Sequence, residues 1–318
     1  MELLLHLGMP KTGSKALQST LDSNPEPLAD AGLRFAQAGR GRLWHQPLFR
    51  AGDSLAACAE EIRAELQLAP RLLFSYEAGY RADRETIDHL RRLAPLRALL
   101  FVRDPVAWVN SHFNQLVKAH RTTYADILGF DVGSARLQHQ LDVRRHLDRW
   151  FRAVPDLSLR VAPYTRSTSV TDVVLEWAGV DSRQRACFTP PPSGVNSALG
   201  LDDLRLLIEV KRQLADSDEA TLVEVMNYIH ASLEGRLIDT RRSEGTAILS
   251  GPEKAAVAAR FTADYQALLT DFGSPDPGSL VDDRRYAETP RRQLFSPGDQ
   301  DRSRAAQLIE RARSAAGA

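Results

Sequence analysis

The sequence of 318 residues predicts an α/β protein: a parallel β-sheet flanked by helices, with a mostly helical C-terminal subregion. Two observations favour this class. In the first half of the chain, short and almost entirely apolar runs, typical of strands covered on both faces, alternate with segments of helical periodicity. Such alternation implies parallel pairing through right-handed crossovers. From about residue 196 onward, the periodic segments all have the helical repeat.

The strands are expected where apolar residues follow one another with few polar breaks. The run at 2–7 leads into a glycine-containing loop, and the runs at 71–76 and 96–102 have the length and composition of strands buried on both faces. Shorter runs at 32–35 and 157–161 complete the expected sheet.

Helices are expected where apolar residues recur three and four positions apart. Residues 16–21 have this spacing after the first strand. Pro105, a residue type favoured in the first helical turn, opens another helix, and Ser250 with Glu253 has capping-box spacing before a third. The helices expected after the first one are 54–68, 83–93, 106–118, 141–151, 171–178, 201–214, 219–233, 253–272 and 303–315.

The chain length suits one large domain or two small ones. We expect one α/β domain over residues 1–272, with its helical subregion from about 196. A proline-rich stretch at 189–195 is interpreted as the linker into that subregion. The remaining residues, 273–318, form a polar, arginine-rich tail with a short helix.

The composition indicates which class of binding partner and which cellular compartment to expect. Equal numbers of basic and acidic residues, 41 of each, argue against a nucleic-acid partner and favour a small-molecule or glycan partner. The two cysteines, Cys58 and Cys187, lack the spacing of a zinc site or a disulfide framework, so we expect a cytoplasmic protein with no metal site. No run approaches the roughly 20 apolar residues of a membrane span, so we expect no integral membrane segment. The sequence leaves open whether the chain forms a homodimer.

A glycine-marked loop between the first strand and its helix predicts an anion site, because such loops present backbone N–H groups and a positive helix end. Only five of the 41 basic residues are lysines, and two of them lie in this loop. The loop also has the glycine spacing of a nucleotide-binding P-loop, but Ala16 stands where that motif needs a Mg²⁺-binding hydroxyl. The donors expected to meet an anion are Lys11, Thr12, Gly13, Ser14 and Lys15.

The stretch Pro10-Lys-Thr-Gly-Ser-Lys15 resembles the 5′-phosphosulfate loop of sulfotransferases that use 3′-phosphoadenosine 5′-phosphosulfate (PAPS). A second stretch strengthens the resemblance: Arg103 ends an apolar strand and Ser111 follows eight positions later, the spacing of that family's 3′-phosphate motif. Arginine offers a bidentate fork to phosphate, and the serine adds a hydroxyl two helical turns on. The resemblance covers about residues 1–272 and departs from the family at Lys15, where a hydroxyl residue is usual.

The resemblance implies a P-loop-type fold, PAPS as the donor, and no metal. It further implies that Lys11 contacts the oxygen bridging phosphate and sulfate, while Arg103 and Ser111 hold the 3′-phosphate. The acceptor that fits bacterial relatives is a hydroxyl of a carbohydrate, a glycolipid or a small natural product.

Sulfuryl transfer also needs a base to take the acceptor proton. Glu77 is the first candidate, because it follows the strand 71–76 and should emerge at the carboxyl edge of the sheet. His45 is the alternative, since a histidine titrates near neutral pH.

Two other functions stay open at this point. A nucleotide kinase or ATPase could use the same loop, with Asp104 as its magnesium carboxylate, and would require Mg²⁺ with ATP. A non-catalytic sulfotransferase-like scaffold could bind nucleotide without turnover. In that case Lys15, which replaces the usual hydroxyl residue, would indicate that catalytic activity has been lost.

Overall fold

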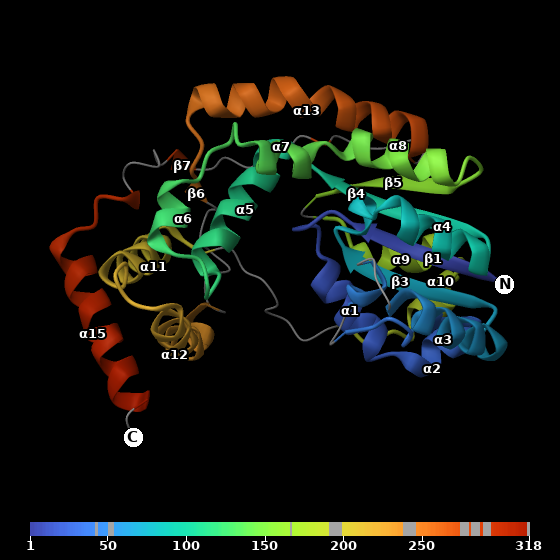
Figure 1. Cartoon of the computed structure of the whole chain (residues 1–318), viewed down its shortest axis with the longest axis horizontal. Helices are drawn as coiled ribbons and strands as arrows, with labels where there is room; N and C mark the ends of the chain where they lie inside the picture. Colours follow the sequence, from blue (N-terminus) through green and yellow to red (C-terminus); the bar gives the residue numbers. More distant parts are fainter. Residues whose placement is uncertain are drawn as a thin grey trace. The chain divides into compact units, whose positions relative to one another are not determined.

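A computed structural model describes residues 1–41, 44–49, 54–165, 167–190, 199–237, 246–273, 280, 287–288 and 294–316 (Figure 1). The chain divides into two compact units. The first comprises Met1–Asp104, His139–Val195 and Arg260–Asp282, and the second comprises Pro105–Gln138, Asn196–Ala259 and Asp283–Ala318. The expected linker at 189–195 lies outside the described residues except for its first two positions.

The first unit contains the predicted parallel sheet. Its five strands are all parallel and follow the order β2-β3-β1-β4-β5. The expected strands are confirmed, and most extend by one to three residues at their carboxyl ends because the ladder pairing continues there. The strands are β1 (Glu2–Gly8), β2 (Leu33–Phe35), β3 (Arg71–Glu77), β4 (Leu96–Arg103) and β5 (Ser158–Tyr164).

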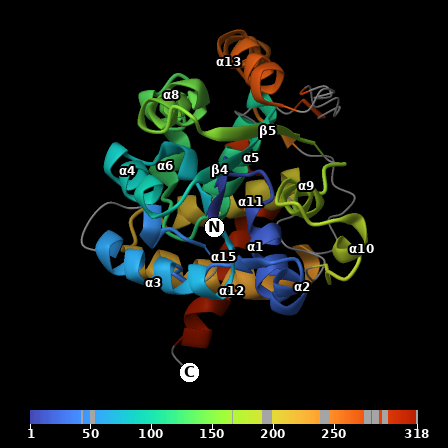
Figure 2. The ribbon, with the colours of Figure 1, turned by 90° about the vertical axis from the view of Figure 1, so that its right-hand side faces the viewer.

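Helices cover both faces of this sheet, which is why its central strands β1 and β4 are mostly apolar and buried. Figure 2 shows α3 (Ser54–Leu68), α4 (Arg84–Leu93) and α8 (Val143–Ala153) on one face. The helices on the other face are α1 (Ser14–Asp22), α2 (Pro25–Asp30), α9 (Val170–Trp177) and α10 (Ser182–Arg185). Strand residues such as Leu4, Leu73 and Phe101 form a core with Leu17 of α1 and Val174 of α9.

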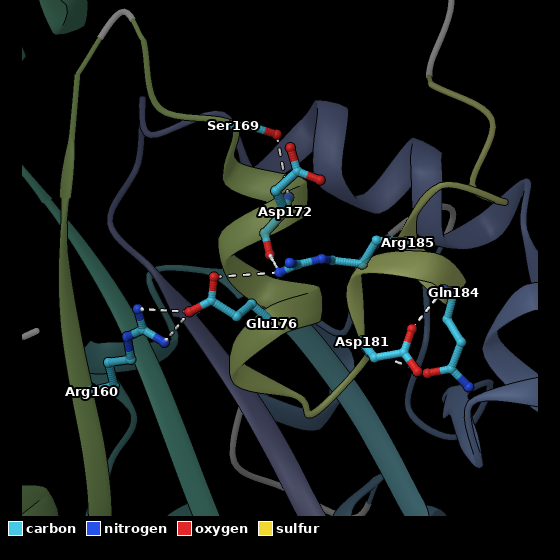
Figure 3. Close-up of polar contacts among 7 residues, drawn as sticks. All are labelled: Arg160, Ser169, Asp172, Glu176, Asp181, Gln184 and Arg185. Carbon is cyan, nitrogen blue, oxygen red and sulfur yellow. Dashed lines mark hydrogen bonds and ion pairs between the residues drawn. The ribbon is translucent and has the colours of Figure 1, made fainter.

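Polar contacts fix α9 beside the edge strand β5 (Figure 3). Glu176 on α9 accepts from Arg160 of β5 at 3.4 Å and pairs with Arg185 of α10 at 3.3 Å. Ser169 caps the first turn of α9, so the position of its first residue, Val170, is well defined. Val170 in turn packs against the loop that follows β1, as described below.

The second unit is mainly helical, as expected for the C-terminal region. It contains a short parallel pair, Thr246–Ala247 with Ala287–Glu288 (β6 and β7). In this unit, α11 packs against α5, α6 and α15. The helices are α5 (Pro105–Lys118), α6 (Tyr124–Leu128), α11 (Leu201–Gln213), α12 (Glu219–Leu237) and α15 (Asp299–Ala316), while α7 (Ala135–Leu141) and α13 (Gly251–Phe272) contribute residues to both units.

A buried lysine on α11 supports the end of α5. Lys211 is 1% exposed, and its Nζ donates to Ala119 O at 2.7 Å and to Thr122 O at 2.5 Å. These carbonyls follow the last turn of α5, where a cation is favourable. Burial lowers the pKa of Lys211 to about 8, yet the two carbonyls satisfy its ammonium.

Candidate phosphate-binding site

The carboxyl ends of the strands bring three of the predicted site residues to one edge of the sheet. Gly8, the last residue of β1, is paired with Glu77, the last of β3. From β1 the chain moves toward β2 at one side of the sheet, and from β4 it moves toward β5 at the other. The neighbours β1 and β4 therefore flank a topological switch point, the place where open α/β sheets bind ligands. Lys11 follows β1 and Arg103 ends β4 at that point.

The loop between β1 and α1 is a cradle that depends on its two glycines. Gly13 precedes α1 with φ of 79°, in the left-handed region, and a Cβ there would lie 3.0 Å from Val170 Cγ2. A Cβ on Gly8 would lie 2.7 Å from Ser14 Oγ. Among the described residues no side chain caps α1, so its first N–H groups and positive dipole end are directed at the loop. Such a helix end is suited to an anion.

The two hydroxyl residues of the loop are buried. The side chains of Thr12 and Ser14 are both fully buried. Thr12 Oγ1 donates to Met9 O at 2.6 Å and so closes the loop on itself. Ser14 Oγ points at the backbone of Gly8, close to the position that a Cβ would occupy. Thr12 therefore shapes the loop, whereas the buried Ser14 Oγ has no hydrogen-bond partner among the described residues. The expected contacts of both hydroxyls with an anion stay predictions.

Lys11 is held in an uncommon backbone conformation. Its φ of 69° is in the left-handed region, which costs a residue with a side chain about 1 to 3 kcal/mol. Arg103 Nη1 donates to Lys11 O at 3.0 Å, from a side chain that is 8% exposed. The guanidinium also lies over the ring of Tyr164, 5.5 Å from its centroid. Lys15, by contrast, is exposed on the first turn of α1.

Glu77 and Lys11 influence each other's charge. Burial raises the pKa of Glu77, and Lys11 and Lys15 oppose that rise. Burial also lowers the pKa of Lys11; Glu77 opposes that shift, while Arg103 and Lys15 add to it. The carboxyl of Glu77 is thus easier to protonate than in water, and the ammonium of Lys11 is less strongly hydrated. A carboxyl whose pKa is raised toward the working pH has the property needed for acid–base work.

The turn after Glu77 is fixed by its neighbours. Ala78 has φ of 76° and donates its N–H to Gly8 O, which ties the ends of β1 and β3 together. The next turn is anchored by Tyr80, whose hydroxyl donates to Gln140 O at 2.7 Å. Trp150 Nε1 donates to Tyr80 O at 3.1 Å. The backbone on the carboxyl side of Glu77 is therefore held by hydrogen bonds.

His45 does not join the other candidates. Its ring is fully buried, Nε2 donates to Ala36 O at 2.8 Å, and Nδ1 accepts from Ser75 N at 3.0 Å. Burial lowers the pKa of His45 to about 4. Both ring nitrogens are therefore occupied by backbone groups, and His45 links the loop after β2 to β3. This arrangement favours Glu77 over His45 as the base.

Protonation of buried histidines makes the fold sensitive to acid. Burial lowers the pKa of His6, like that of His45, from 6.5 to about 4. An unfolded chain binds the protons first, so the stability that these residues contribute is complete above pH 6.5 and is lost as the pH falls toward 4. We expect the free energy of unfolding to drop by about 2 kcal/mol per histidine between pH 7 and pH 5. His146 and His230, whose pKa burial also lowers, add to the drop.

Urea unfolding at the two pH values measures this loss. In the His45→Gln variant the pH dependence should shrink by the contribution of one histidine. An unchanged dependence would show that His45 does not remain neutral in the fold.

Ser111 is half-buried on α5, in the second unit. Its joint contact with Arg103 to one ligand stays a prediction from the eight-residue spacing. Within the described ranges, no three His, Cys, Asp or Glu side chains gather as a metal site requires. No helix among the same residues is long and apolar enough to cross a membrane.

Comparison with known proteins adds no assignment. No protein-family model matches the chain. A search of curated proteins gives no significant match either.

Proposed function

We propose that this chain is a sulfotransferase that moves a sulfuryl group from PAPS to an acceptor hydroxyl. The proposal is supported mainly by the contact between Arg103 and the backbone of Lys11. That contact brings together, at the switch point of the sheet, the two segments that resemble the donor-binding motifs of sulfotransferases. Glu77 ends the strand next to them.

Each residue has a definite task in this reaction. The acceptor oxygen forms a bond to sulfur while the bond from sulfur to the bridging oxygen breaks, and 3′,5′-bisphosphoadenosine leaves. Glu77 takes the acceptor proton. Lys11 stabilises the negative charge that develops on the leaving 5′-phosphate oxygen. The uncapped N-terminus of α1 and exposed Lys15 hold the 5′-phosphate, and Arg103 binds the 3′-phosphate.

The electrostatics of the site suit these tasks. A general base works best when its pKa is near the working pH, and burial moves the pKa of Glu77 in that direction. Lys11, partly withdrawn from water, interacts more strongly with a developing charge than an exposed lysine would. In-line transfer of this kind depends mainly on positioning and charge stabilisation, which the rigid carboxyl edge provides.

Titration calorimetry tests the proposal against its alternatives. We expect the chain to bind adenosine 3′,5′-bisphosphate without any metal and to bind it more tightly than ATP with Mg²⁺. A preference for ATP with Mg²⁺ would favour a kinase or ATPase and contradict the proposal. Tight bisphosphate binding without transfer from PAPS to any of a panel of sugars, glycolipids and phenols would favour a scaffold.

A further inference from the structure

We infer that Arg103 is a positioning residue for Lys11. Its hydrogen bond to the Lys11 backbone carbonyl holds this lysine in its left-handed conformation whether or not a ligand is present. The inference rests on the proposed function for what Lys11 does, and on geometry alone for how Lys11 is held. It assigns Arg103 a task beyond the 3′-phosphate contact that the sequence motif predicts.

The conformation of Lys11 needs an external support. A left-handed backbone is uncommon for a residue with a branched or long side chain, and Lys11 adopts it between Pro10 and Thr12. Within the loop, Thr12 Oγ1 donates to Met9 O, a contact that does not involve the Lys11 carbonyl. The 3.0 Å bond from Arg103 Nη1 fixes Lys11 at this carbonyl.

Arg103 is itself held firmly enough to act as a support. It is the last residue of β4 and is paired with Tyr164 in the ladder with β5. Its guanidinium lies over the Tyr164 ring and is almost entirely shielded from water. A cation over an aromatic ring in such a setting loses little freedom when it makes a further hydrogen bond. Arg103 therefore connects the edge strand β5, through its contact with Tyr164, to the loop after β1.

The consequence is that Arg103 contributes to binding of the 5′ end of the donor through Lys11. If Arg103 contacted only the 3′-phosphate, its removal would not change the affinity for ligands that lack this group. If Arg103 positions Lys11, its removal must weaken binding of every ligand that uses the loop, with or without a 3′-phosphate. The two interpretations therefore differ in a measurable way.

The strand offers a matched control. Arg97 lies near the start of β4, its Nη2 donates to Trp177 O at 2.8 Å, and its guanidinium lies 5.4 Å from the Trp177 ring centroid. It thus makes the same two kinds of contact as Arg103 at the amino end of the strand, and it also pairs with Glu2 at 3.4 Å. Arg97→Ala should reproduce any general loss of stability without acting on the loop.

Two measurements on the full chain test the inference. In hydrogen exchange without ligand, Arg103→Ala should speed exchange of the amides of Met9 and of residues 11–13 by tenfold or more, with the centre of β1 unchanged. Arg97→Ala should not. In calorimetry, Arg103→Ala should weaken adenosine 5′-monophosphate, which lacks the 3′-phosphate, by tenfold or more. Exchange in the loop at the wild-type rate, or unchanged affinity for the monophosphate, would overturn the inference.

The outcomes separate this inference from the proposed function. If the wild-type chain binds neither nucleotide, the proposed function fails, and loop exchange alone decides whether Arg103 holds Lys11. If Arg103→Ala does not fold, Arg103→Lys keeps the charge and the long stem but loses the planar fork. That variant should shift loop exchange and monophosphate affinity in the same direction by a smaller factor, and wild-type values for both would count against the inference.

Discussion

The Glu77→Gln variant is expected to transfer sulfuryl groups at least 100-fold more slowly than the wild type. Glutamine keeps the size of the side chain and its place at the end of β3, but it cannot accept the acceptor proton. Loss of a general base typically lowers the rate by 10² to 10⁴. Initial rates with saturating PAPS and a good acceptor measure this effect. Binding of the bisphosphate product should change little, because Glu77 is not proposed to contact it.

The pH profile makes the assignment of Glu77 more specific. The base must be ionised to act, so the rate should rise with pH through the pKa of Glu77, which burial raises above the usual range of a glutamate. The rising limb should therefore lie at higher pH than for an exposed carboxyl and should disappear in Glu77→Gln. Glu85→Gln, which alters an exposed residue in the first turn of α4, serves as the control. A wild-type rate in Glu77→Gln would exclude Glu77 as the base.

Local patterns predicted the sheet because its strands depend on local composition. Mostly apolar runs located all five strands, and the end of the run 71–76 placed Glu77 at the carboxyl edge. Four short helices, α2, α6, α7 and α10, were not predicted, since four to seven residues hardly show a helical period. Two of them begin with a capping box, Thr123 with Asp126 and Asp181 with Gln184, which could have revealed them.

The details of the site depend on contacts between distant parts of the chain, and these have no local pattern. Arg103 and Lys11 are 92 residues apart, and nothing in either motif indicates that one donates to the carbonyl of the other. The burial of His45 depends on Ala36 and Ser75, which belong to two different parts of the sheet. Likewise, the residue types of the loop do not indicate that the side chains of Thr12 and Ser14 are buried. Residue type therefore predicted which groups could act, while orientation required the structure.

Lys11→Met should lower the rate of sulfuryl transfer by 100- to 1000-fold, the size expected when the main group stabilising a developing anion is removed. Methionine keeps an unbranched stem of similar length but carries no charge. Stability should not fall, because burial disfavours the charged form of Lys11 and lowers its pKa, so removing the charge relieves a cost. Urea unfolding beside rate measurements would show a loss of activity with the free energy of unfolding unchanged or raised.

Two further variants separate charge from conformation at this position. Lys11→Gly also removes the charge, but glycine adopts a φ of 69° without strain, so it should be as inactive as Lys11→Met and at least as stable as the wild type. Lys15→Met removes a neighbouring exposed charge and should weaken nucleotide binding by no more than several-fold, since a solvent-exposed lysine interacts through water. If Lys15→Met were the more damaging change, the leaving-group role would belong to Lys15, the position where the loop departs from the sulfotransferase pattern. If Lys11→Gly kept activity, Lys11 would not be the group that stabilises the leaving 5′-phosphate oxygen.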